Sequence, residues 1–464
     1  MRKAGVLIHI STLPGEYGCG TFGKYAYDTA DFLHDAGFSI WQVLPFNVPH
    51  RDSSPYSSAS TFAQNPLFID PDILVEKGLL TPEETAKMRE EIRSLSGDLY
   101  ELSLHRERYL RLAARRTLAT PLEEAINKYL NENLRICEAC KFLEKKSGKG
   151  DFYYHAFVQY EFYEEWSALH GYLKKLGIEV IGDIPIYADL NSSEVHFNPE
   201  CFKLDEDGKP EFVSGVPGDT FSSYGQKWGH PLYCTEALKK DNYSLLFDRM
   251  AFAASVYDVI RIDHFQAIAS YYAIPHDKDP KDGHWEKGVG EPFVKRLADE
   301  IGCEKFVVED FNCFPGGSYA LATKYGFPDM NTLQFTLSAG KTPKTYRKMT
   351  VAYTGTHDND TFKGYLKKLS KKELTRVKKL LGAGSDTTLD ELCILGIESL
   401  LSSPAERVVI PVQDLLFEGS ESRMNVPGIS GHGNWHYRID EQRLKLLCES
   451  AERWRKMLKL YERV

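Results

Sequence analysis

The sequence predicts an α/β protein built as one (β/α)8 TIM barrel, with a helical insertion after its second strand. Three observations support this fold class. Short apolar runs alternate with helical patterns along most of the 464 residues, and such alternation is typical of a parallel sheet covered by helices. Eight such runs can be found, which is the number that closes a barrel. Acidic residues stand where several of these runs end.

The eight predicted strands extend from the beginning of the chain to its last quarter. They are Gly5–Ser11, Ser39–Pro45, Glu179–Tyr187, Asp258–Phe265, Lys305–Phe311, Thr332–Thr336, Met349–Thr354 and Arg407–Asp414. Helical patterns fall between most of them, at Lys24–Ala36, Phe152–Leu176, Glu236–Val256 and Glu291–Ile301. A doubly wound open sheet would show the same alternation, so it remains the alternative architecture.

We expect a single domain, 1–464, in which two stretches interrupt this rhythm. Residues of about 72–149 carry several helix signals, including Thr81 directly before Pro82, which is typical of a helix start. We therefore expect a helical insertion between the second and third strands. A smaller, β-containing insertion is expected after the third strand, at about 189–234. There the stretch CFKLDEDGKPEFVSG indicates a hairpin that turns at Asp207-Gly208.

Composition and charge exclude several classes of function. The net charge of −9 disfavours nucleic acid as a partner, because phosphate contacts need clustered basic residues. The Lys-rich stretch Lys363–Lys379 is interpreted as a solvated helix face. No apolar run is long enough to span a membrane. Cys137 and Cys140 form the sole C-x-x-C, without the second pair that a zinc site needs. The odd number of cysteines, nine, fits a reducing compartment, so a cytoplasmic location is expected.

Acidic residues end four of the predicted strands. They are Asp183 in VIGDIP, Asp263 in VIRIDHF, Glu309 in FVVEDF and Asp358 in YTGTHDND. The carboxyl ends of all strands meet at one mouth of a (β/α)8 barrel, where active sites lie. Arg261 shares a strand face with Asp263, because side chains alternate along a strand. Any one of these acids could be a helix cap, but four at four ends favour one shared site.

Glycosyl transfer is a chemistry that would use this set. It needs two carboxyl groups with opposed roles, roughly 5–5.5 Å apart in a retaining enzyme. Asp263 and Glu309, on neighbouring strands, could meet that separation. We expect Arg261 to keep Asp263 ionised, and burial with nearby anions to raise the pKa of Glu309 so that it carries a proton. Asp358 and His357 suit hydrogen bonds to sugar hydroxyls.

Two further observations bear on the ligand. Aromatic residues in loops after the strands could lie against pyranose rings, although core packing explains each of them equally well. They are Tyr56, Tyr187, Tyr224 and Trp228. The same acids with His9, His264 and His357 could instead hold a metal ion, but neither an H-x-H nor an H-E-x-x-H spacing occurs. Phosphate-loop patterns are absent too.

Several motifs occur in order along nearly the whole chain. They are GVLIHISTLPGEYGCGTFG, WQVLPF, SSPYSSASTFAQNPLFID, IGDIPIY, GQKWGHPLY, VIRIDHF, VVEDF, YTGTHDNDT and SRMNVPG-ISGHGNW. With them the sequence resembles the 4-α-glucanotransferase or amylomaltase family, glycoside hydrolase family 77 in the α-amylase-like superfamily. The resemblance implies a barrel without a separate C-terminal β-domain. It also implies retaining transfer of an α-1,4-glucan segment from a donor maltodextrin to a glucose or maltodextrin acceptor, without metal or organic cofactor.

The resemblance also implies residue roles. Asp263 would be the nucleophile, Glu309 the acid/base and Asp358 the stabiliser of the transition state. Supporting positions fall on Arg261, His357 and Asp183. Substrate-binding or loop positions fall on Tyr56, Asp219, Gln226, Trp228, His264, Asp310 and Asn425. The sequence makes no prediction of oligomeric state.

Four positions depart from the family pattern without touching the predicted carboxylates. Ser53 replaces an Asp before S-P-Y, Gly218 a Pro in G-V-P-P-D, Gln266 an Arg after R-I-D-H-F, and Ser338 an Asp in Q-F-A-F-D. We expect altered donor and acceptor contacts, and a loop loosened by Gly218. Hydrolysis through the same intermediate and glucan binding without turnover remain alternatives. A transferase must favour a sugar acceptor over water by about 5.5 kcal/mol.

Overall fold

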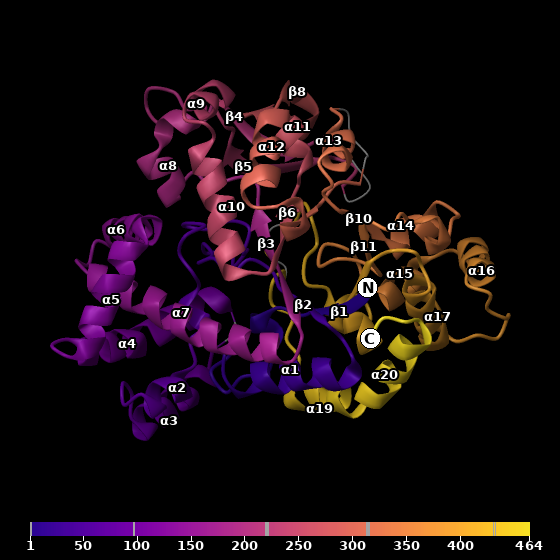
Figure 1. Ribbon diagram of the computed structural model, residues 1–464, viewed down its shortest axis with the longest axis horizontal. Helices are drawn as coiled ribbons and strands as arrows, with labels where there is room; N and C mark the ends of the chain where they lie inside the picture. Colours follow the sequence, from indigo (N-terminus) through magenta and orange to yellow (C-terminus); the bar gives the residue numbers. More distant parts are fainter. Residues whose placement is uncertain (1, 96–97, 219–221, 312–315, 430, 432) are drawn as a thin grey trace.

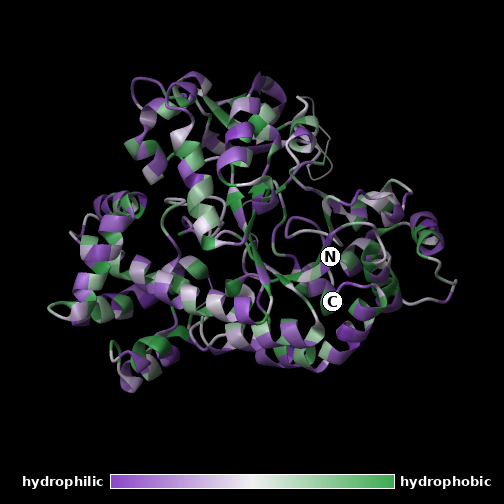
Figure 2. Ribbon diagram, in the orientation of Figure 1, coloured by the Kyte–Doolittle hydropathy of each residue, from purple (hydrophilic) through white to green (hydrophobic). Residues whose placement is uncertain are grey.

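A central barrel surrounded by helices forms the body of the molecule (Figure 1). The computed structural model describes residues 2–95, 98–218, 222–311, 316–429, 431 and 433–464. Figure 2 shows apolar residues concentrated on the central strands, whereas most helices are apolar on one side and polar on the other. Among the described residues, no helix combines the length and apolar character that crossing a membrane requires.

Eight parallel strands make up the barrel, in the order β10-β11-β12-β1-β2-β3-β6-β9. They are β1 (Lys3–Leu7), β2 (Ile40–Gln42), β3 (Glu179–Pro185), β6 (Val259–Asp263), β9 (Phe306–Val308), β10 (Asp329–Thr332), β11 (Thr350–Tyr353) and β12 (Arg407–Pro411). The two edges meet where the N–H of Val308 donates to the carbonyl of Pro328 at 2.9 Å. The predicted (β/α)8 barrel is therefore confirmed, and the open-sheet alternative is wrong.

The barrel interior is apolar at mid-height and polar at its carboxyl end. Each strand contributes a buried apolar side chain to the interior cluster: Leu7, Ile40, Ile181, Val259, Val307, Met330, Val351 and Val409. Toward the carboxyl ends, the buried side chains become polar, among them Asp183 and Arg261. The polar side chains at the carboxyl end therefore pack against a close-packed apolar layer inside the barrel.

The sixth barrel strand does not lie where the sequence predicted it. The expected strand Thr332–Thr336 overlaps β10 at Thr332 alone, and helix α14 (Leu333–Ser338) occupies the rest. Leu333 and Leu337 are both fully buried, so this stretch buries apolar residues with a helical spacing of four. A short apolar run fits a strand or a helical turn equally well, which explains the error.

Between β2 and α7 (Phe152–Lys175), which precedes β3, the described residues form five α-helices. They are α2 (Pro71–Glu76), α3 (Pro82–Ile92), α4 (Leu99–Thr117), α5 (Pro121–Glu132) and α6 (Leu134–Ser147). Thr81 caps α3 through a capping box with Glu84, as its position before Pro82 indicated. The buried guanidinium of Arg106 in α4 donates to the carbonyls of Leu67 and Ile69. These bonds attach the helical lobe, seen at the left of Figure 1, to the chain that follows β2.

A second, antiparallel sheet lies beyond the carboxyl end of the barrel. Its strands are β4 (Phe212–Val216), β5 (Gln226–Pro231), β7 (Ser270–Pro275) and β8 (His284–Lys287), in the order β5-β4-β7-β8. Two strands follow β3, inside the expected insertion, but the other two follow β6. The predicted turn is present, since the N–H of Gly208 donates to the carbonyl of Asp205 at 3.0 Å. Only a single bridge, Leu204 to Pro210, flanks this turn, because β4 pairs with β5 and β7 instead.

The predicted helix Glu236–Val256 is two helices, α9 (Thr235–Lys240) and α10 (Ser244–Val256). Asn242 and Tyr243 between them have φ angles of 50° and 62°, which no helix accommodates. The other helices that cover the barrel are α1 (Lys24–Ala36), α7 (Phe152–Lys175), α12 (Glu291–Glu300), α15 (Phe362–Lys368), α16 (Lys371–Leu380), α17 (Leu389–Leu401), α19 (Glu441–Glu449) and α20 (Ala451–Leu460).

Candidate active site

The acidic side chains at the strand ends converge on one cavity. Asp263 ends β6, Glu309 follows β9 directly, and Asp358 follows β11. All three line a cavity of about 1390 Å³ at the carboxyl end of the barrel. Backbone pairing sets Glu309 beside Asp263, because the N–H of Glu309 donates to the carbonyl of Ile262 at 3.0 Å. Asp183 in β3 is buried beneath this group.

Arg261 is the cation around which the carboxylates gather. Its side chain is fully buried. Nη1 lies 2.7 Å from Asp183 Oδ2 and 3.0 Å from Asp263 Oδ1, while Nη2 lies 3.0 Å from Glu309 Oε1. The hydroxyl of Tyr56 also donates to Asp183 at 2.8 Å. One rigid guanidinium fork thus fixes three carboxylates that come from different strands.

The protonation of the Asp263–Glu309 pair is opposite to the expectation. Burial, together with repulsion from Glu309, raises the pKa of Asp263 well above its ordinary value, and Arg261 only partly opposes this. Burial acts on Glu309 too, but Arg261, the His264 amide and a hydrogen bond from Asp263 outweigh it, so the pKa of Glu309 is lowered. The two carboxyls therefore titrate as a coupled pair.

The cause lies in the number of donors that each carboxyl receives. Glu309 has the ion pair with Arg261 Nη2 to itself and also accepts a hydrogen bond from the backbone N–H of His264 at 2.8 Å. Asp263 shares Nη1 with Asp183. Because two tightly coupled carboxyls titrate as one unit, the proton passes between them when their surroundings change.

Asp358 is held at the mouth by three neighbours. Its Oδ1 accepts a bond from the side-chain amide of Asn425 at 2.6 Å, and His357 Nε2 lies 3.3 Å from Oδ2. Arg423 donates to the Asp358 carbonyl at 2.8 Å. Asn425, predicted to contact substrate, thus also orients Asp358, and Arg423 was not predicted at all.

An aromatic wall stands over the carboxylates. The ring of Tyr56 is stacked on His357, with centroids 5.2 Å apart and an interplanar angle of 10°. Trp435 adjoins both rings, at 5.7 Å from Tyr56 and 6.0 Å from His357. Sequence reasoning missed Trp435, although the motif GHGNW that contains it is one of those quoted above. Its φ of 67° is strained for a bulky residue, which is common at functional sites.

The opposite wall carries groups that can hydrogen bond to a ligand. Trp228 packs edge-on against His264, with centroids 4.8 Å apart, and donates to Gln226 at 3.1 Å. Both ring nitrogens of His264 are buried without a hydrogen-bond partner among the described residues. Burial lowers the pKa of His264 to about 4, so a neutral imidazole faces the cavity. Asp310 lines the same cavity, whereas Asp219 lies outside the described residues.

The four departures from the family pattern occupy distinct positions. Gln266 is buried, where its amide donates to the Ser270 hydroxyl at 2.7 Å. Ser338 is exposed on the cavity rim and its hydroxyl contacts that of Tyr365 at 3.0 Å. Ser53 is buried with a φ of 61°.

Gly218 has a packing reason, because a Cβ there would lie 2.5 Å from the carbonyl oxygen of Ser223. The loosening of this loop stays a prediction. No group of three or more His, Cys, Asp or Glu within the described part of the chain has the arrangement of a metal site.

Comparison with known proteins identifies the family. The family model described as 4-alpha-glucanotransferase, Glyco_hydro_77, matches residues 8–142 and 135–444. The chain belongs to this family. The 4-alpha-glucanotransferase of Aquifex aeolicus is 34% identical over 493 residues, covering 100% of both chains. The enzyme of Thermus thermophilus is 34% identical over 504 residues, covering 97% of this chain and 99% of the relative.

Solved structures of the 4-alpha-glucanotransferase family agree with this assignment. An amylomaltase from Streptococcus agalactiae, solved in complex with acarbose, superposes with a TM-score of 0.92 at 28% identity and covers 100% of both chains. An amylomaltase from Corynebacterium glutamicum, at 16% identity and a TM-score of 0.79, supports the fold alone. The predicted glucan transfer is thereby confirmed as the activity of the family to which this chain belongs.

Proposed function

We propose that the chain transfers α-1,4-glucan segments by double displacement through a glycosyl ester on Asp263. The observation that carries this proposal is the convergence of Asp263 and Glu309 on the guanidinium of Arg261 at one cavity. Each carboxyl lies 3.0 Å from a nitrogen of the same guanidinium, and this closeness favours the shorter separation of retaining enzymes over that of inverting enzymes, which must admit a water between them.

The first half-reaction breaks the donor. Because the two carboxyls titrate as a coupled pair, the mechanism requires their shared proton to be on Glu309 when attack begins. The Asp263 carboxylate then attacks the anomeric carbon while Glu309 protonates the departing glycosidic oxygen. Asp358 and His357 accept and donate hydrogen bonds to sugar hydroxyls as the ring acquires positive charge.

The second half-reaction builds the new bond. Glu309, now ionised, takes the proton of an acceptor 4-hydroxyl, whose oxygen attacks the anomeric carbon and releases Asp263. His264, Gln226 and Trp228 lie on the wall nearest Glu309 and suit the positioning of the acceptor. An oriented sugar competes with water because the bound hydroxyl has a high effective concentration.

Incubation with maltotriose tests the proposal. Transfer yields glucose together with a ladder of oligomers longer than the substrate, which chromatography resolves. Products that are all shorter than maltotriose would show hydrolysis instead. Binding of maltodextrin without any products would show a binding protein. The donor substrates and the glucose or maltodextrin acceptor belong to the same proposal, supported by the glucan-active relatives.

We also infer a cytoplasmic location for this activity. The eight cysteines of the described residues are free, as expected of a reducing compartment. Three plant relatives carry the words chloroplastic/amyloplastic in their names, so the location differs among members of the family. Fractionation of the source cells with a compartment marker tests this part of the proposal.

A further inference from the structure

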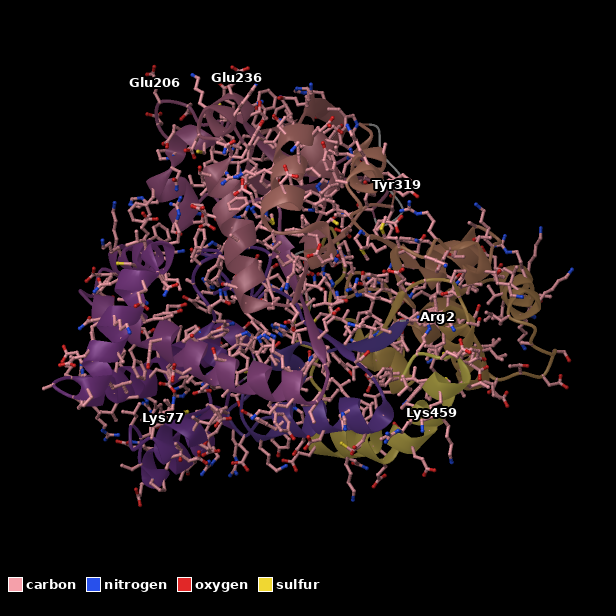
Figure 3. The ribbon with its side chains drawn as sticks, viewed as in Figure 1. Arg2, Lys77, Glu206, Glu236, Tyr319 and Lys459 are labelled. Carbon is pink, nitrogen blue, oxygen red and sulfur yellow. The ribbon has the colours of Figure 1, made fainter. Side chains whose placement is uncertain are left out.

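The cavity that holds the carboxylates continues along β10 between helix α13 (Ser318–Lys324) and helix α14. Four residues of its lining are grouped here as the side arm: Tyr319, Asp329, Thr332 and Arg347. In Figure 3 the labelled Tyr319 lies on the side of α13 toward α14. Neither the predicted roles nor the proposed reaction uses any of these side chains.

Buried polar atoms in the side arm lack partners within the described part of the chain. Asp329 is 4% exposed, and while its Oδ2 accepts a bond from Arg347 at 2.7 Å, its Oδ1 has no partner. The hydroxyl of Thr332, which is 2% exposed, and Nε of Arg347 are likewise without partners. Buried polar groups are nearly always hydrogen-bonded, so three such atoms on residues that line one cavity indicate a ligand with donors and acceptors of its own.

The side arm also offers a flat apolar surface. The guanidinium of Arg347 lies 4.9 Å from the centroid of the Tyr319 ring, which fixes both groups. Tyr319 is half-buried, so part of its ring borders the cavity. A pyranose presents C–H groups to such a ring and hydroxyls at its edges.

Charge decides which class of ligand fits. Asp329 already neutralises Arg347, so the side arm carries no net charge to attract a phosphate or a carboxylate. A carboxylate oxygen and a guanidinium N–H side by side instead match the acceptor and donor of vicinal sugar hydroxyls. Neutral sugar is therefore the ligand that these groups recognise best.

We propose that the side arm binds glucose units of an α-1,4-glucan remote from the bond that is broken, and so favours longer chains. This inference rests on the proposed function. Because the arm is one cavity with the carboxylates, a single glucan chain can occupy both. The contact is made by a part of the substrate that does not react and that short chains lack. Losing this contact therefore raises the KM of long chains more than the KM of short chains.

The test compares chain lengths in a Tyr319→Ala variant. The ratio of KM for maltoheptaose to KM for maltotriose is expected to rise about fivefold, as loss of one sugar–aromatic contact implies. Maltoheptaose should also bind about fivefold more weakly in calorimetry when Tyr319→Ala is added to a Glu309→Gln protein, which binds without turnover. Tyr325→Ala is the matched control, because Tyr325 follows α13, contacts Glu291 and does not line the cavity.

A second variant, Asp329→Asn, keeps the shape of the side arm and removes the charge. Its KM ratio is expected to rise in the same direction, with thermal unfolding recorded alongside. An unchanged ratio in either folded variant, or an equal rise in Tyr325→Ala, overturns the side-arm proposal. If the wild-type protein yields no longer oligomers from maltotriose, the proposed function itself fails, which is a separate outcome.

Discussion

Arg261 gathers three carboxylates with one buried guanidinium, and this arrangement sets the behaviour of the site at the scale of single residues. Asp183, Asp263 and Glu309 all lie within 3.0 Å of its nitrogens. Their positions could be predicted, because each acid ends a strand and all strand ends meet at one mouth. The directions of the pKa shifts of Asp263 and Glu309 could not be predicted, because they depend on how many donors each carboxyl receives.

Removing the guanidinium is expected to destabilise the fold as well as the site. An Arg261→Ala variant leaves the buried Asp183 and the partly buried Asp263 and Glu309 without a cation, and breaking a buried pair costs about 3–5 kcal/mol. The difference in unfolding free energy between this variant and the wild type should become smaller at low pH, where the carboxyls take up protons. Thermal unfolding at several pH values measures this, with Arg261→Lys, which keeps the charge but loses the fork, as an intermediate case. Unfolding of Arg261→Ala at the wild-type temperature would contradict the arrangement.

Neutralising a single reacting carboxyl should instead lower turnover far more than it changes stability. Asp263→Asn or Glu309→Gln is expected to lower turnover by about three orders of magnitude or more. Asp263→Asn should not lose stability, because it removes repulsion between neighbouring acids. Glu309→Gln should lose some, because the lowered pKa of Glu309 means that its charged form favours the folded protein. The measurements are transfer rates with maltotriose and the thermal midpoint. Asp277→Asn is the matched control, since Asp277 is exposed and outside the cavity, and an undiminished rate in either site variant would refute the assigned roles.

At the scale of secondary-structure elements, the helix α18 (Val412–Leu415) holds a buried acid that joins two neighbours. Asp414 accepts bonds from the hydroxyl of Thr354, after β11, and from the N–H of Phe362, at the start of α15. Burial raises the pKa of Asp414 to about 6. The folded protein therefore holds this proton more tightly than the unfolded chain, where the pKa is near 3.8.

This shift makes stability depend on pH in a definite direction. The contribution of Asp414 is fully present below about pH 4 and is lost as pH rises through about 6, amounting to about 3 kcal/mol. In an Asp414→Asn variant the free energy of unfolding should fall less between pH 4 and pH 6, by about 3 kcal/mol. Thermal or urea unfolding across this range measures it, and parallel curves for the two proteins would show that Asp414 titrates normally.

Elements with a clear sequence pattern could be predicted. A short apolar run that fits both a strand and a helix could not, and neither could the pairing of distant strands. Helices such as α1 and α7 follow from their long amphipathic patterns and flanking strands. The sixth strand failed because Leu333 and Leu337 also satisfy a helical spacing. The pairing of β4 with β7 was missed because no local signal reports which distant strand completes a sheet. Trp435 was missed for the same reason, since a loop near the chain end reaches the site only in the folded molecule.

At the scale of the whole molecule, a buried arginine joins the last turn of the chain to the amino-terminal end of the barrel. The guanidinium of Arg463 donates to the carbonyls of Leu401, Ser403, Ala405 and Lys3. These carbonyls belong to the end of α17, the approach to β12 and the first residue of β1. The bottom of the barrel is thus held where three segments far apart in sequence meet, as the two marked ends in Figure 1 show.

An Arg463→Ala variant should lose stability without losing chemistry. Four carbonyls lose a charged donor, and we expect a cost of about 3 kcal/mol. The transfer rate measured well below the unfolding temperature should match wild type, because stability and catalysis occupy opposite ends of such barrels. Arg455→Ala, an exposed arginine on α20, serves as the control and should unfold like wild type. Equal midpoints for the two variants would disprove the role of Arg463.

The small antiparallel sheet is shared by the segments that follow β3 and β6, and this has a consequence for protein engineering. Lys203 and Tyr271 both bond to Glu286 in this sheet, and none of the three lines the large cavity. Yet the sheet carries Trp228, and β7 begins seven residues after Asp263. We expect substitutions at these outer contacts to shift Trp228 through the sheet. Transfer to a sugar acceptor could then be tuned against hydrolysis while the residues that line the cavity stay unchanged.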